Sequence, residues 1–96
     1  MTWSSEITDW TSSVFGPPGA FFLKKAKKEF AELEEAVAQG QSPEKIALEC
    51  ADVVICLVGV CAFYGRDLAL CVIAKMLINK GRKWKQQEDG TWQHVK

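Results

Sequence analysis

The chain has 96 residues, a length typical of one small domain, and we expect residues 1–96 to form a single domain. It is 48% hydrophobic and 25% charged, which is too apolar and too balanced in charge for an intrinsically disordered protein. Its 12 basic and 12 acidic side chains cancel, which argues against nucleic acid or an anionic membrane surface as a partner.

The cysteines and the first residues indicate a cytoplasmic protein. No two of the four cysteines form a CxxC pair, and the only histidine, His94, lies far from them, so a zinc site is poorly supported. We expect buried, reduced thiols. Residues 1–6 lack the basic start and apolar core of a signal peptide. The apolar run 53–63 is too short for a membrane span, which needs roughly 20 residues.

The first half of the chain predicts two helices. A short helix begins near Ser4 or Ser5 and runs towards Val14. The segment 16–19, Gly-Pro-Pro-Gly, then breaks the chain. A longer helix covers about 20–39, because apolar residues recur there at steps of three and four, and a glycine follows its end.

The second half predicts two more helices and a hairpin. Ser42 and Pro43 are typical of a helix start, and this helix runs to about Tyr64. Asp67 is a candidate cap for a further helix that reaches roughly Lys83. The pair 89–90, Asp-Gly, is a hairpin-type turn. We therefore predict an all-α helical bundle of three to four helices, completed by oligomerisation, with a short C-terminal hairpin.

Two pairs of acidic residues suggest a metal site. Glu29 and Glu32 are three residues apart on one predicted helix, as are Glu49 and Asp52 on the next, so each pair shares a helix face. The second of these helices is otherwise apolar on every side after Lys45, so we expect Asp52 to be buried.

Buried carboxylates that crowd together repel one another and should have raised pKa values. A divalent cation removes this cost, and ligands that are all oxygen favour Mg²⁺, with Mn²⁺ as a substitute. The alternative for Glu29 and Glu32 is a solvated helix face at the edge of the apolar stripe. A di-iron site is excluded because no histidine follows an acid by three residues in any predicted helix. The run of lysines at 24, 25, 27 and 28 is also interpreted as a solvated face.

These residues resemble a known family, the MazG-like nucleotide pyrophosphohydrolases. Glu29-Phe-Ala-Glu32 followed by Glu49-Cys-Ala-Asp52 resembles their ExxE…ExxD signature, and the stretch 75–84 resembles the lysine, asparagine and arginine segment that follows. The stretch 15–95 is similar to the short subtype labelled a dATP/dGTP pyrophosphohydrolase domain. Lys28 departs from the family, which often has a second glutamate there.

The resemblance implies Mg²⁺-dependent hydrolysis of a (deoxy)nucleoside triphosphate to the monophosphate and pyrophosphate, as house-cleaning or nucleotide-pool control. It implies metal ligation by Glu29, Glu32, Glu49 and Asp52. A carboxylate could also accept a proton from the attacking water, and the candidates are Glu32, Glu35 and Glu49. The alternative function is a non-catalytic helical interaction module that keeps the fold.

A polar stripe on the third long helix is the candidate substrate-binding surface. Lys75, Asn79 and Arg82 share one face, and we expect the two cations to meet the triphosphate. The other interpretation is a helix end that leaves the core, where cations suit the helix dipole. This helix also carries two apolar faces, which about three helices cannot cover. We therefore predict an obligate homodimer, which can pair into a tetramer.

Overall fold

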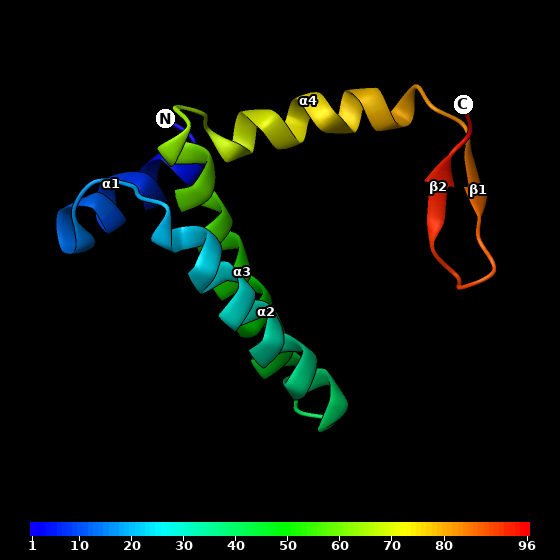
Figure 1. The fold of residues 1–96 in the computed structure, drawn as a ribbon, viewed down its shortest axis with the longest axis horizontal. Helices are drawn as coiled ribbons and strands as arrows, with labels where there is room; N and C mark the ends of the chain where they lie inside the picture. The colour runs from blue at the N-terminus through cyan, green and yellow to red at the C-terminus, as the bar shows by residue number, and fades with distance from the viewer.

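The computed structural model describes residues 1–96 as four helices followed by a two-stranded hairpin (Figure 1). The elements are α1 (Trp3–Phe15), α2 (Phe21–Ala38), α3 (Pro43–Phe63), α4 (Leu68–Lys80), β1 (Trp84–Gln86) and β2 (Trp92–His94). The predicted all-α class and the antiparallel hairpin are confirmed. The last helix is shorter than expected because Gly81 ends it and Trp84 already pairs with His94 in the hairpin.

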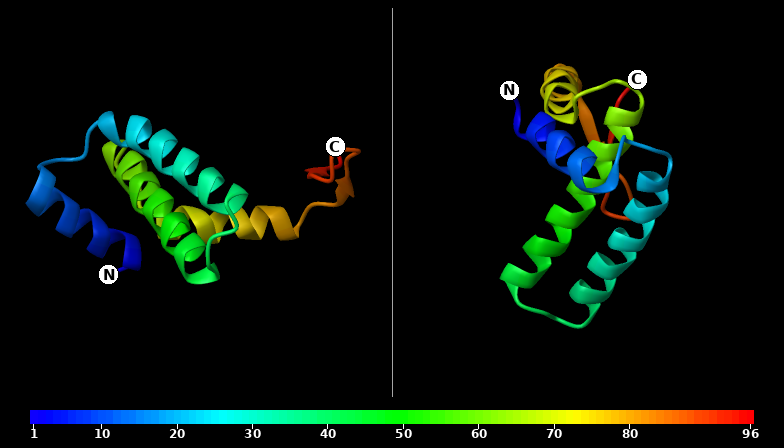
Figure 2. Two further views of the ribbon diagram at one scale, coloured as in Figure 1. Left: turned by 90° about the horizontal axis from the view of Figure 1, so that it is seen from below. Right: turned by 90° about the vertical axis from the view of Figure 1, so that its left-hand side faces the viewer.

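Helices α2 and α3 form an antiparallel pair that is the centre of the fold (Figures 1 and 2). Gly40 ends α2 with φ +64°, a conformation that favours glycine. The Gln41 N–H donates back to the Ala36 carbonyl oxygen at 3.1 Å. The Ser42 hydroxyl oxygen accepts the Lys45 N–H at 3.2 Å and so caps α3. This short connection places the acidic segment of α2 opposite that of α3.

Both small and large side chains of α2 are buried in the contact between α2 and α3. The α2 residues buried there are Phe22, Ala26, Glu29 and Ala36. The ring of Phe22 lies against Gly59 of α3. The larger apolar residues of α2 lie beside this contact and remain more than half exposed: Leu23, Phe30 and Val37.

Hydrogen bonds made by hydroxyl groups join the starts of α1 and α4. Thr2, not Ser4 or Ser5, caps α1, because its side chain accepts the Ser5 N–H at 3.0 Å. Asp67 precedes α4 as predicted, but its carboxylate instead accepts the hydroxyls of Thr2 and Ser4. These two hydrogen bonds lower the pKa of Asp67 below its usual range. The fully buried Ser4 caps α4 in its place by accepting the Ala69 N–H at 2.9 Å.

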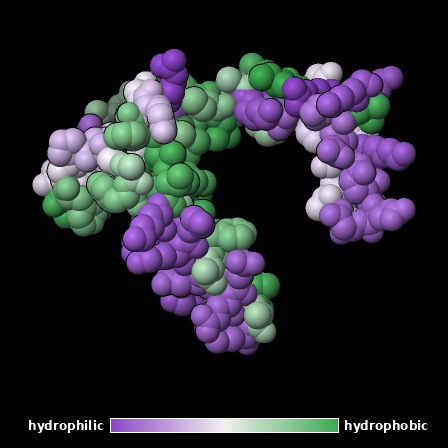
Figure 3. Space-filling model, viewed as in Figure 1, coloured by the Kyte–Doolittle hydropathy of each residue, from purple (hydrophilic) through white to green (hydrophobic).

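The single chain does not enclose a core of its own. Helix α4 touches only α1 and α3 and carries the hairpin away from the α2–α3 pair (Figure 1). Only 11 of the 96 residues are buried, and the radius of gyration is 15.7 Å, against about 12.5 Å for a compact chain of this length. Apolar residues are exposed where α1, α3 and α4 meet, whereas hydrophilic residues cover much of the visible face of α2 (Figure 3).

Helix α3 is longer than the apolar run that appeared too short for a membrane span. It has 21 residues and a mean hydropathy of 2.3 over its most apolar stretch, so its length and composition alone would allow it to cross a membrane. It carries Lys45, Glu49 and Asp52, however, and it contacts α1, α2 and α4. We therefore interpret α3 as the central helix of the bundle.

Candidate metal and nucleotide site

Three of the four predicted metal ligands meet between α2 and α3. One carboxylate oxygen from each of Glu29, Glu32 and Glu49 lies within 4.8 Å of the others. Glu29 and Glu49 are buried at 8% and 7% exposure, and Glu32 is exposed. The group thus sits at the edge of the helix contact, with two acids inside it and one facing solvent. Three oxygen ligands at this spacing suit a hard divalent cation.

Asp52 is placed differently from the expectation. It lies one turn after Glu49 on α3, but it is exposed and is not part of the three-acid group. The prediction that Asp52 is buried is wrong for the single chain. Asp52 is exposed because an apolar helix is enclosed only if neighbouring elements surround it, and α4 leaves much of α3 uncovered.

Two lysines that were not among the predicted site residues neutralise the buried acids. The Lys25 ammonium lies 3.0 Å from Glu29, and the Lys45 ammonium lies 3.0 Å from Glu49. Each lysine precedes its acid by four residues on the same helix, and this spacing is the signal that could have identified them. Lys25 therefore does not belong to a purely solvated lysine face.

These contacts shift the pKa values of Glu29 and Glu32 in opposite directions. The hydrogen bond from Lys25 lowers the pKa of Glu29. The hydrogen bond with Glu29, and then the negative charge of Glu29, raise the pKa of Glu32. The expected rise from crowding therefore holds for Glu32, whereas the pKa of Glu29 is lowered because the hydrogen bond from Lys25, aided by the one from Glu32, outweighs the effect of burial.

A polar cleft of about 400 Å³ adjoins the acids, next to the loop between α2 and α3. Its polar lining residues are Glu32, Glu35, Gln39, Gln41, Lys45 and Glu49. A chain of amide hydrogen bonds orients one wall: Gln41 Nε2 donates to Gln39 Oε1, and Gln39 Nε2 donates to Glu35 Oε1, each at 3.0 Å.

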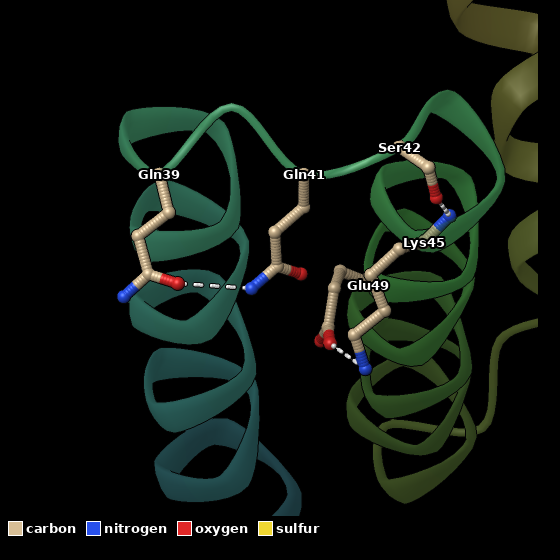
Figure 4. A network of polar contacts seen from close by, with 5 residues as sticks. All are labelled: Gln39, Gln41, Ser42, Lys45 and Glu49. Carbon is tan, nitrogen blue, oxygen red and sulfur yellow. Dashed lines mark hydrogen bonds and ion pairs between the residues drawn. The ribbon is translucent and has the colours of Figure 1, made fainter.

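Two oxygen atoms of this cleft are buried without a hydrogen-bond partner. They are Gln41 Oε1 and Glu49 Oε2. The side chain of Gln41 lies between the helices with its carbonyl oxygen on the side of Glu49 (Figure 4). A buried acceptor without a partner is costly, and a cation or its bound water would satisfy it. The oxygen ligands present at this site therefore fit a divalent metal ion.

The chain is similar to known proteins that act on nucleotides. No protein-family model matches the chain. It is 45% identical over 73 residues to a dATP/dGTP diphosphohydrolase of Salmonella phage PMBT28, a match that covers 76% of this chain and 23% of that protein. The chain thus spans about a quarter of the length of that curated relative.

A solved structure gives the decisive likeness. The chain matches the cyanophage S-2L MazG-like pyrophosphohydrolase, bound to dGDP and three catalytic Mn²⁺ ions per active site, with a TM-score of 0.67 and 26% identity. The match covers 97% of this chain and 93% of that one. The chain has a MazG-like fold, and its sequence is similar to that of a dATP/dGTP diphosphohydrolase. The resemblance carried by the ExxE and ExxD motifs is confirmed.

The two sides of the MazG-like α2–α3 pair differ in chemistry. The acids and the cleft occupy one side. Shallow apolar grooves line another, and their residues include Phe30, Leu33, Val37, Ile46, Cys50, Val53 and Leu57. All four cysteines are free thiols, but only Cys56 is buried, while Cys50 and Cys71 are exposed. The expectation of buried thiols thus holds for one of them, because the single chain leaves the apolar faces of α3 and α4 open.

The predicted substrate stripe lies apart from the acids within one MazG-like chain. Lys75 and Arg82 are exposed on α4 and just after it, and α4 makes no contact with α2. Asn79 is half-buried, and its backbone carbonyl oxygen accepts the Trp84 indole N–H at 2.9 Å. A single chain therefore does not bring the three stripe residues to the metal group.

Proposed function

We propose that this chain is a Mg²⁺-dependent pyrophosphohydrolase that converts a (deoxy)nucleoside triphosphate to the monophosphate and pyrophosphate. The observation that carries the proposal is the group of Glu29, Glu32 and Glu49, whose oxygens lie within 4.8 Å of one another beside an unpartnered Glu49 oxygen. Such a group is costly without a cation and well suited to one. The MazG-like likeness supports the same reaction, since the similar cyanophage protein binds dGDP and Mn²⁺.

The proposed roles follow from position. Glu29, Glu32 and Glu49 would hold the metal, with Asp52 as a fourth ligand one turn further along α3. The bound ion would offset charge on the phosphates and on the departing pyrophosphate. Of the candidate bases, Glu35 lines the cleft yet lies outside the three-acid group, so the carboxylate oxygen that does not accept the Gln39 amide would take a proton from water.

We also propose that the chain acts as a homodimer, which can pair into a tetramer, in the cytoplasm. The exposed apolar surface of α3 and α4 and the large radius of gyration support association. Since α4 carries Lys75 and Arg82 away from the acids of its own chain, the stripe would serve the site of the partner protomer. Light scattering tests this, and a folded monomer at micromolar concentration would contradict it.

The reaction is tested by pyrophosphate release from a panel of deoxynucleoside triphosphates with and without Mg²⁺. Glu35→Gln should abolish release while metal binding persists. Glu34→Gln is the matched control, because this neighbouring acid borders the apolar grooves on the other side of the helix pair. Absence of metal-dependent release from the unsubstituted chain would favour the alternative of a non-catalytic interaction module.

A further inference from the structure

The proposed metal site already contains two cations that belong to the chain. Lys25, on α2, contacts Glu29, and Lys45, in the first turn of α3, contacts Glu49. Both ammonium groups lie 3.0 Å from a carboxylate that is about nine-tenths buried, while the lysine side chains themselves are more than half exposed. Each lysine can therefore move into solvent without disturbing the helix contact.

Helix stability alone does not explain these two lysines. In both pairs the lysine precedes the glutamate by four residues, which is the less favourable order for an ion pair on a helix. Lys45 also lies in the first turn of α3, where the helix dipole disfavours a cation. What both positions share is contact with an acid of the proposed metal group.

We propose that Lys25 and Lys45 are displaceable counter-ions, which neutralise Glu29 and Glu49 in the metal-free chain and turn towards the phosphates of the nucleotide when a divalent ion binds. This inference rests on the proposed function. An oxygen that accepts an ammonium hydrogen bond at 3.0 Å cannot also take a metal ion in the same direction, so the metal and the lysine compete. Displacement leaves two ammonium groups at the mouth of the site, where they suit a triphosphate.

The competition is tested by titrating Mn²⁺ alone into the full chain and its variants by calorimetry. Lys25→Met and Lys45→Met keep the length and apolar stem of the side chain but remove the charge. Each should tighten Mn²⁺ binding by roughly twofold to fivefold, as expected for loss of a partly exposed ion pair. Each should also lower the melting temperature of the metal-free chain, and weaken binding of dGDP in saturating Mn²⁺.

Lys24→Met is the matched control, because Lys24 is exposed on the same helix and forms no ion pair. It should change none of the three quantities. Unchanged or weaker Mn²⁺ binding by Lys25→Met and Lys45→Met would overturn the counter-ion proposal and leave the proposed function intact. If the unsubstituted chain binds no Mn²⁺, the metal site and with it the proposed function are contradicted.

Discussion

The phenyl ring of Phe22 lies directly on the backbone of Gly59. A Cβ atom added to this glycine would sit 2.4 Å from the Cγ and Cδ2 atoms of the ring, which is closer than any real contact of a Cβ. Gly59 is itself buried within the second half of α3, and glycine is otherwise unfavourable inside a helix. The glycine therefore sets how closely α2 and α3 approach, and the same approach brings Glu29 towards Glu49.

Replacing Gly59 with alanine should destabilise the fold. The gain in helix propensity is smaller than the cost of moving a buried ring, so we expect a net loss of about 1–3 kcal/mol in the free energy of unfolding. Urea denaturation measures it. Gly81→Ala is the control, since a Cβ there would make only ordinary contacts at 3.6 Å and 3.7 Å. Equal stability of the two variants would show that α2 can shift away from α3 at no cost.

Removing the charge of Glu32 should stabilise the metal-free chain at neutral pH. The pKa of Glu32 is higher in the folded chain than in the unfolded chain, so its ionised form destabilises the fold. This destabilisation is present at pH values above the folded-state pKa and disappears as the pH falls below the unfolded-state pKa. Glu32→Gln should therefore melt at a higher temperature than the parent at neutral pH, and the difference should vanish near pH 4. Thermal melts monitored by circular dichroism test this, with Glu34→Gln as the control, because this acid borders the apolar grooves on the other side of the helix pair.

Substitution of Asp52 tests whether this residue is a metal ligand or a surface acid. If it completes the metal site, Asp52→Asn should abolish pyrophosphate release and blunt the rise in melting temperature on adding Mg²⁺. Because Asp52 is exposed, the metal-free variant should be as stable as the parent or more so. Retained pyrophosphate release would remove Asp52 from the essential ligands, and a large loss of metal-free stability would assign it a structural role.

Substitution of Arg82 tests whether the stripe of Lys75, Asn79 and Arg82 binds the substrate. Arg82→Ala should weaken nucleotide binding about tenfold or more, because charge-assisted contacts contribute roughly 1.5–3 kcal/mol. The fold should be unaffected, since Arg82 is exposed and its side chain forms no ion pair. Calorimetric titration of a nucleotide in saturating Mg²⁺ measures the effect, and Lys96→Ala at the end of the chain serves as the control. Unchanged affinity would identify the stripe as a solvated helix end.

The sequence predicted the helices, the hairpin and the meeting of three of the four acids, because these depend on local periodicity and on short connections. The spacing of Glu29, Glu32 and Glu49 needs only two antiparallel helices and a loop at Gly40. The burial of Asp52 was wrong because burial depends on what covers α3, and no local pattern contains that information. The cap of α4 was also missed, because Ser4 lies far away in the sequence.

The hydroxyl of Ser4 caps a helix that begins more than sixty residues later in the chain, at a sequence separation of 65. The start of α4 has no local cap, so the Ala69 N–H gains its partner only after α1 has docked. Closing so long a loop has an entropic cost, whereas the turn between α2 and α3 closes locally. The helical pair should therefore form early in folding, with the first and last helices becoming ordered together afterwards. The amides at the starts of α1 and α4 should then exchange their hydrogens at similar rates.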